Sequence, residues 1–241
     1  MAFKTDPRYA QARAGVPAER IDEGLRAYML SVYNYMGLAL AVTGIVAMFV
    51  ASTPALYVPI FTTPLKWVVM LAPLAFILIL SFGINKLNVF QAQVLFWTFA
   101  AVMGLSLASI FLVFTGESIA RTFFITAASF GALSLYGYTT KKDLSGWGSF
   151  LIMGVFGIII AMIVNLFLGS SALQFAISVI GVLIFAGLTA YDTQNIKNTY
   201  FEVQHDGTAM GKSAIMGALR LYLDFINLFM FLLQFLGSQR D

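Results

Sequence analysis

The chain has 241 residues, of which 60% are apolar and only 10% are charged, and its mean hydropathy is +0.86. Soluble domains carry about a quarter charged residues, so this composition indicates an all-α integral membrane protein rather than a soluble enzyme, and we expect no enzymatic activity. The absence of cysteine excludes disulfides and thiolate chemistry, and the single histidine, His205, leaves no ligand set for zinc. The net charge of +3 does not indicate nucleic-acid binding, because the basic residues cluster beside the apolar segments, where they set topology.

Residues 1–29 precede the first apolar segment. Met1 to Arg26 alternates acids and bases and contains neither the apolar core nor the cleavage site of a signal peptide. We therefore expect a cytoplasmic N-terminal tail over residues 1–29, partly helical and loosely attached, followed by a seven-helix transmembrane domain over residues 30–241.

Seven segments are long and apolar enough to span a bilayer, which takes about 20 residues in a helix. They are predicted at Leu30–Ala51, Trp67–Ile84, Ala92–Phe114, Ile119–Tyr138, Trp147–Leu168, Ala172–Tyr191 and Gly217–Leu236. The alternating pattern of a membrane barrel is absent. The start of the seventh span is the hardest to place, because Lys212 and Arg220 interrupt its approach.

Lysine and arginine concentrate in the loops on one side of these spans. With a cytoplasmic N-terminus, the inner side holds Lys4, Arg8, Arg13, Arg20, Arg26, Lys86, Lys141, Lys142, Lys197 and Lys212. The outer side holds only Lys66, Arg121 and Arg240. The positive-inside rule therefore predicts the N-terminus in the cytoplasm and, with seven full spans, the C-terminus outside. A re-entrant seventh segment would instead return the C-terminus to the cytoplasm.

Small residues recur at helical spacing in three spans. They include Ala100, Gly104 and Ala108 in the third, Ala127, Gly131, Ser134 and Gly137 in the fourth, and Gly154 and Gly157 in the fifth. Small residues let transmembrane helices approach closely, so we interpret them as packing positions.

Two acids lie in or at the end of predicted spans. Asp192 closes the sixth span, and Asp224 lies within the seventh. Inserting an ionised acid at the centre of a membrane helix costs roughly 2.5–3.5 kcal/mol, so such a group is neutralised, paired or hydrated, and it suggests a function. If the seventh span starts near Gly217, both carboxyl groups lie at a similar depth from the cytoplasmic face.

Two carboxyl groups at that depth on neighbouring helices can form a hydrogen bond. They would share one proton and titrate as a pair in two macroscopic steps. Such a pair senses pH, because protonation joins the two helices and full ionisation pushes them apart. Its hard oxygens also suit Ca²⁺, so Asp192 and Asp224 are candidate Ca²⁺ ligands. The alternative is two independent acids, each in a salt bridge.

Two basic residues are candidate counter-charges for this pair. Arg220 precedes Asp224 by four positions, so both can lie on one face of the helix and pair. The alternative for Arg220 is an extended side chain that reaches the cytoplasmic interface. Lys86, at the inner end of the second span, can approach the pair from another helix.

Five short segments are the most distinctive of the chain: Val32-Tyr33 with Met36, Phe124-Ile125-Thr126-Ala127, the segment from Leu133 to Leu144, Ala190-Tyr191-Asp192-Thr193-Gln194, and the segment from Leu221 to Phe229. In these segments the sequence resembles the transmembrane Bax-inhibitor-motif family, and in particular its bacterial members. The resemblance covers the chain after the tail.

This resemblance implies seven helices with a central helix wrapped by the others, in a bacterial inner membrane. It implies a pH-sensitive Ca²⁺ leak in which Asp192 and Asp224 share a proton and gate the cytoplasmic end of the path. A basic residue of the second helix would switch between them, and Lys86 is the residue available here. No further cofactor is implied. Some bacterial relatives restrain the membrane-anchored ATP-dependent FtsH protease, which gives a second hypothesis: a regulatory partner of that protease.

Overall fold

A computed structural model describes residues 18–240, with side chains from Glu23 onward. Eight helices occupy this part of the chain: α2 (Ala18–Ser52), α3 (Pro54–Thr62), α4 (Leu65–Gly83), α5 (Val89–Val113), α6 (Gly116–Thr139), α7 (Ser145–Leu168), α8 (Ser171–Val203) and α9 (Gly207–Leu236). Seven of these helices are long and apolar enough to cross a membrane. The prediction of an all-α membrane protein with seven spans is therefore confirmed.

Three helices start or end beyond the predicted spans. Helix α2 is already formed at Ala18, α8 continues to Val203, and α9 begins at Gly207 instead of Gly217. In the predicted tail, residues 1–17 lie outside the described residues, whereas Leu25, Tyr28 and Met29 are buried. This part of the expected loose tail is therefore a packed end of α2.

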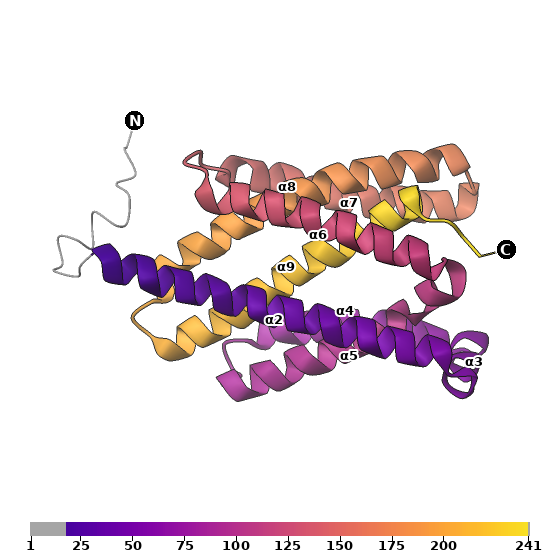
Figure 1. Cartoon of the computed structure of the whole chain (residues 1–241), viewed down its shortest axis with the longest axis horizontal. Helices are drawn as coiled ribbons and strands as arrows, with labels where there is room; N and C mark the ends of the chain where they lie inside the picture. The colour runs from indigo at the N-terminus through magenta and orange to yellow at the C-terminus, as the bar shows by residue number, and fades with distance from the viewer. Residues whose placement is uncertain (1–17, 241) are drawn as a thin grey trace.

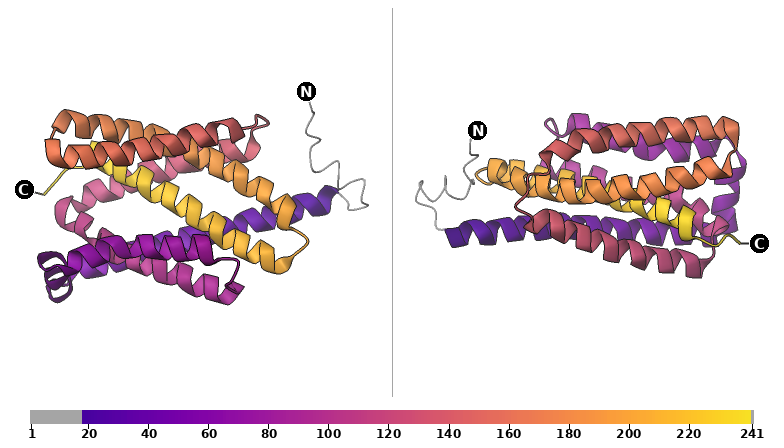
Figure 2. Two further views of the ribbon diagram at one scale, coloured as in Figure 1. Left: turned by 180° about the vertical axis from the view of Figure 1, so that it is seen from behind. Right: turned by 90° about the horizontal axis from the view of Figure 1, so that it is seen from above.

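The helices form two groups with α9 between them (Figure 1). Helices α2, α4 and α5 pack together on one side, and α6, α7 and α8 pack together on the other. Helix α9 crosses the bundle obliquely and contacts α2, α5, α6 and α8. Figure 2 shows the same arrangement from behind and from above, with α7 and α8 antiparallel and side by side.

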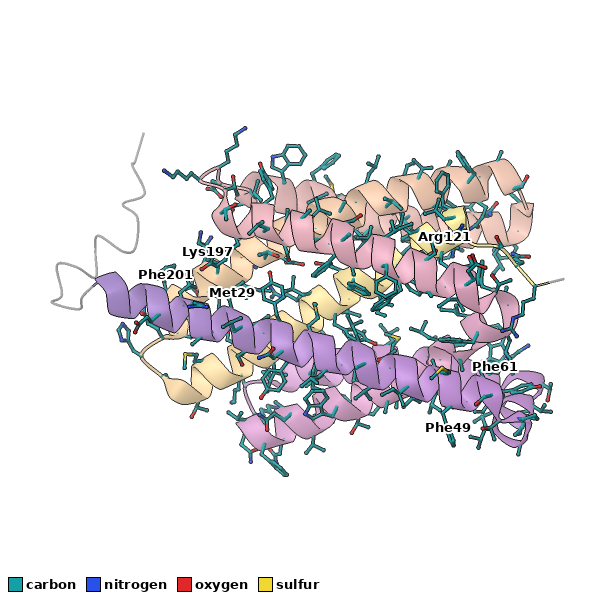
Figure 3. All side chains as sticks on the ribbon, in the orientation of Figure 1. Met29, Phe49, Phe61, Arg121, Lys197 and Phe201 are labelled. Carbon is teal, nitrogen blue, oxygen red and sulfur yellow. The ribbon has the colours of Figure 1, made fainter. Side chains whose placement is uncertain are left out.

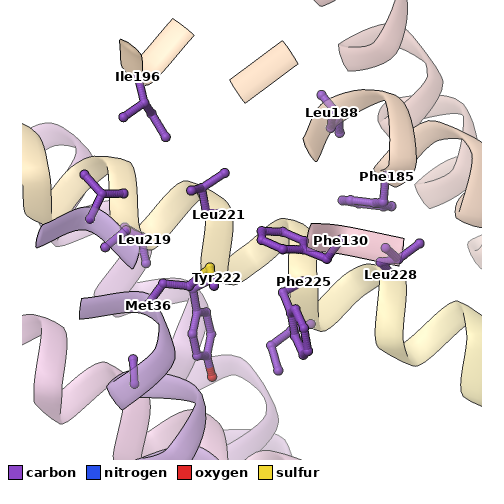
Figure 4. Packing of buried hydrophobic residues seen from close by; sticks show 14 of the residues in the cluster. Met36, Phe130, Phe185, Leu188, Ile196, Leu219, Leu221, Tyr222, Phe225 and Leu228 are labelled. Atoms are coloured by element: carbon purple, nitrogen blue, oxygen red, sulfur yellow. The ribbon is translucent and has the colours of Figure 1, made fainter. Parts of the chain in front are cut away.

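Helix α9 is the core of the molecule. Two thirds of its most apolar window is buried inside the bundle, a larger share than in any other span. Leu221, Tyr222, Phe225 and Leu228 of α9 meet side chains of α2, α6 and α8 (Figure 4). The prediction of a central helix surrounded by the others is confirmed.

Close helix contacts occur at three of the predicted glycines, Gly104, Gly137 and Gly154, and a Cβ added at Gly154 would lie 2.5 Å from the Ile184 Cδ1 atom of α8. A Cβ added at Gly104 would lie 2.7 Å from the Thr43 carbonyl oxygen of α2. A Cβ added at Gly137 would overlap the backbone of Ala190 on α8. In contrast, Gly131 and Gly157 have open space where a side chain would be, so their interpretation as packing positions was wrong.

The chain ends at the opposite end of the bundle from the start of α2 (Figure 1). There, the Thr115 amide donates to the Ser238 carbonyl, and the Arg240 amide donates to the Val113 carbonyl. Figure 3 shows Arg121 and Phe61 near this end and Lys197 and Met29 near the other. Helix α9 is thus long enough for a complete span and is not a re-entrant segment. The predicted inner residues Lys4, Arg8 and Arg13 lie outside the described residues, and which end of the bundle faces the cytoplasm stays a prediction.

Candidate gating site

Asp224 lies in the middle of α9, on the face that the bundle covers. Its side chain is only 4% exposed, and its neighbours Leu221, Phe225 and Leu228 are buried with it. Helix α9 places Asp224 there because apolar residues occupy the surrounding positions, so the buried face of the helix includes the acid. Its Oδ2 atom has no hydrogen-bond partner. Burying a carboxyl oxygen without a hydrogen-bond partner costs free energy of folding, so packing alone does not explain an acid at this position.

Asp192 lies on α8, in its last turns before the loop to α9, and it is half-buried. The side chains of Asp192 and Asp224 lie within hydrogen-bonding reach of each other. Two carboxyl groups in contact can form a hydrogen bond only if one of them holds a proton. The two predicted acids are therefore brought together, and their role in gating stays a prediction.

The equal depth predicted for the two carboxyl groups assumed that the last helix starts near Gly217, whereas α9 starts at Gly207. Measured along the helices, Asp192 lies about 16 Å from the end of α8, and Asp224 lies about 25 Å from the start of α9. They meet nevertheless, because α9 crosses the bundle obliquely and packs closely on α8 (Figure 1).

Arg220 is the basic residue whose charge acts on both aspartates. Its side chain is exposed, and within the described part of the chain it forms no direct ion pair with either carboxyl group. Arg220 can therefore stabilise negative charge on the pair while its guanidinium group stays hydrated.

Lys86 is exposed in the turn between α4 and α5. Among the described residues it contacts neither aspartate, and α4 does not pack on α8 or on α9 to any extent. A role for Lys86 as the switching base stays a prediction, and it would require a different position of α4.

A chain of hydroxyl groups fixes α8 next to Asp192. The Thr193 hydroxyl donates to the Thr189 carbonyl (2.7 Å), so its remaining contact is accepted from Ser134 of α6 (2.9 Å). Ser134 in turn accepts a hydrogen bond from the Tyr33 hydroxyl of α2 (2.9 Å). Three helices are thus linked within one residue of Asp192, by polar residues whose joint role the sequence reasoning missed.

Two further side chains attach α8 to the last turn of α6 and to the loop that follows it. The Gln194 side chain accepts from the Leu144 amide and donates to the Lys142 carbonyl, both at 2.8 Å. The Lys197 ammonium group donates to the Tyr138 carbonyl at 2.7 Å. Both residues lie within two turns of Asp192, so the helix segment that carries the acid moves together with this loop. The signal for this was the polar run at the end of the sixth span.

The pair does not constitute a complete metal site. Within residues 18–240 no group of three or more histidine, cysteine or acidic residues could hold a metal ion. Bound Ca²⁺ takes six to eight oxygen ligands, about twice what two carboxylates supply. Asp192 and Asp224 therefore suit brief contact with a passing, partly hydrated cation better than tight binding.

These features define a class: a seven-helix membrane protein with two neighbouring carboxyl groups where its central helix meets an adjacent helix. The family model described as "Inhibitor of apoptosis-promoting Bax1" matches residues 25–241, and the chain belongs to this family of membrane proteins. The predicted resemblance is therefore confirmed.

Bacterial relatives match nearly the whole chain. An uncharacterized protein of Caulobacter vibrioides is 50% identical over 94% of this chain and 96% of its own length. An uncharacterized protein of Rickettsia prowazekii is 51% identical over 91% of this chain and 93% of its own length. The inner membrane protein YbhL of Escherichia coli is 47% identical over 90% of this chain and 94% of its own length.

Proposed function

We propose that this protein is a pH-sensitive Ca²⁺ leak of the bacterial inner membrane, with its N-terminus in the cytoplasm, and that the Asp192–Asp224 pair is its gate. The observation that carries the proposal is the contact between these two side chains, with Asp224 buried, on helices α8 and α9, which pack extensively on each other.

With one shared proton, the pair joins α8 to α9 and closes the path. Loss of that proton leaves two carboxylates in contact, and their repulsion in surroundings of low dielectric separates the helices. Water then enters, and the exposed carboxylates attract a hard divalent cation. The sign follows directly: flux increases as rising pH removes the shared proton.

The surroundings leave few other titrating groups to produce this response. Helices α5 and α7 carry no charged residue, and the charged residues of α6 lie at its opposite end. The other charged or phenolic groups nearest in sequence are Glu23, Arg26 and Tyr28 of α2, Lys197 and Glu202 of α8, and Lys212 of α9, whereas Arg220 is the basic group whose charge acts on both aspartates. Arg220 remains as the modulating charge.

The test is Ca²⁺ flux into proteoliposomes between about pH 5 and pH 8. In Asp224→Asn the amide keeps a hydrogen bond to Asp192 but cannot ionise, so flux should stay low and independent of pH. Asp192→Asn should behave in the same way. The matched control is Glu202→Gln, an exposed acid on the same helix α8, which should keep the wild-type pH response. An unchanged pH response in Asp224→Asn would reject the gate.

A second proposal is that the protein binds and restrains the FtsH protease. It is favoured by the charged sequence before α2, with Lys4, Asp6, Arg8 and Arg13, which offers the protease a polar contact. Deletion of residues 2–17 leaves the packed end of α2, with its buried Leu25, in place. Loss of co-purification with the protease, with flux intact, would support this role; co-purification that survives the deletion would count against the tail as the binding segment.

A further inference from the structure

Helices α2 and α6 both pack on α9 but make almost no contact with each other. The space between them is a cavity of about 480 Å³, which is open along the side of the bundle. Its floor includes Met29, Met36 and Phe130, all buried, and its rim includes Leu30 and Leu135, both exposed. A smaller cavity of about 90 Å³ lies further along the same two helices, over Phe225 and Phe229 of α9.

This groove, the α2–α6 groove, faces the hydrocarbon of the bilayer. Its rim leucines are 52% and 63% exposed, as expected of lipid-facing positions. A slot lined by apolar side chains excludes water, and an empty slot forfeits dispersion contacts on one side. Hydrocarbon must therefore fill it, and in a bilayer the available hydrocarbon is an acyl chain.

The mouth of the groove carries positive charge. Arg26 lines it and is exposed, and within the described side chains no ion pair engages it. The span of α2 covers 30 residues, about 45 Å, against a hydrocarbon core of about 30 Å, so its first turns reach the headgroup layer. The Lys197 ammonium group lies 5.3 Å from the centre of the Tyr138 ring, which lines the same mouth.

Polar atoms continue below the mouth. The Tyr33 hydroxyl donates to Ser134 across the groove and keeps its lone pairs for a donor or for water. A molecule that satisfies this arrangement has an anionic head, a polar linkage below it and a long apolar chain.

We propose that the α2–α6 groove is a binding site for one anionic glycerophospholipid, with its phosphate at Arg26 and an acyl chain between α2 and α6. Such a site would exist whether or not the protein conducts Ca²⁺. It lies beside the gate, because Ser134, which lines the groove, is hydrogen-bonded to Thr193 next to Asp192.

The test is native mass spectrometry of the delipidated full chain with phosphatidylglycerol and with phosphatidylcholine of the same acyl chains. One basic side chain near an anionic lipid contributes enough to favour phosphatidylglycerol about fivefold. Arg26→Gln, which leaves the packing unchanged, should remove this preference. Lys141→Gln, an exposed loop charge, should keep it. No preference in the wild type, or an unchanged preference in Arg26→Gln, would overturn the headgroup assignment.

Gly131 offers a direct test of the chain position, because it lines the groove and has open space at its Cβ position. Gly131→Leu should reduce binding of both lipids about tenfold or more, since leucine occupies the room that the chain needs. Gly157→Leu adds the same side chain to an exposed, open position on α7 and should bind lipid like the wild type. Wild-type binding in Gly131→Leu, or equal loss in Gly157→Leu, would refute the site, and oleate binding as tight as phosphatidylglycerol would refute a phospholipid.

Discussion

Thr43 connects three helices at the centre of the bundle, and its replacement tests how the core is held. The Thr43 hydroxyl donates to the Ala100 carbonyl of α5 at 2.8 Å, so it accepts the 2.7 Å hydrogen bond from the Tyr222 hydroxyl of α9. Thr43 is 4% exposed and Tyr222 is fully buried. Neither hydroxyl can be compensated by solvent if its partner is removed.

The expected free energies of unfolding follow from which groups lose their partners. Hydrogen bonds between membrane helices contribute about 0.6 kcal/mol on average and up to about 1.7 kcal/mol. An orphaned buried hydroxyl costs about 1–3 kcal/mol. Thr43→Val removes two hydrogen bonds and orphans the Tyr222 hydroxyl, so it should destabilise the protein by about 2 kcal/mol. Tyr222→Phe leaves Thr43 bonded to Ala100 and should cost about 1 kcal/mol.

The double variant is decisive. Tyr222→Phe removes the hydroxyl that Thr43→Val orphans, and it keeps the edge contact of the ring with Phe99, whose centroid is 5.2 Å away. The double variant should therefore be more stable than Thr43→Val alone, with a coupling free energy of about 2 kcal/mol.

Reversible unfolding in mixed micelles, followed by tryptophan fluorescence, measures all four proteins. Thr98→Val is the matched control, because Thr98 is exposed on α5 and bonds only within its own helix, to the Val94 carbonyl. It should change stability by less than about 0.5 kcal/mol. Additive costs of Thr43→Val and Tyr222→Phe would show that the two hydroxyl groups are not coupled.

Two further substitutions test how α8 is held. Gly137→Ile should destabilise the fold by about 3 kcal/mol, because the added Cβ overlaps the Ala190 backbone, which cannot rotate away. Gly131→Ile on the same helix is the control and should be tolerated, since the space around it is open. Similar melting temperatures for the two variants would reject the close α6–α8 contact. Gln194→Leu removes the acceptor of the Leu144 amide and should speed hydrogen exchange of that amide about tenfold. Asn195→Leu is the control and should leave the exchange rate unchanged. Equal exchange rates in the two variants would mean that Gln194 does not hold the loop.

The sequence predicted the number and type of spans because twenty apolar residues in a row have few alternatives in a membrane. It also predicted the partnership of Asp192 and Asp224, since each is an isolated acid in apolar surroundings and each therefore needs a partner. The span ends were less certain. Residues 192–203 and 207–216 mix polar and apolar side chains, which hydropathy cannot distinguish from a loop, yet both stretches are helical.

The hydroxyl contacts were not predictable from one sequence. Tyr33, Ser134 and Thr193 come from three helices, and their meeting depends on helix rotation and crossing angle, which no local pattern records. Thr43 and Tyr222 are a similar case, separated by most of the chain. Gly131 and Gly157 are packing positions that the sequence predicted and the structure lacks, because a small residue permits close packing without requiring it.

Separation of Asp192 from Asp224 would divide the molecule along one boundary. Thr193, Gln194 and Lys197 tie α8 to α6 and to the loop that follows it, so α6, α7 and α8 would move as a unit. Thr43 and Tyr222 tie the middle of α9 to α2 and α5, so this part of α9 would stay with the other group, while Gln234 near its end keeps hydrogen bonds to Gln174 and Ser178 of α8. The boundary runs between α8 and α9 and continues along the α2–α6 groove, where among the described side-chain hydrogen bonds only Tyr33–Ser134 joins α2 to α6. Opening of the gate would therefore widen the groove, and a lipid bound between α2 and α6 would respond to the protonation of the carboxyl pair.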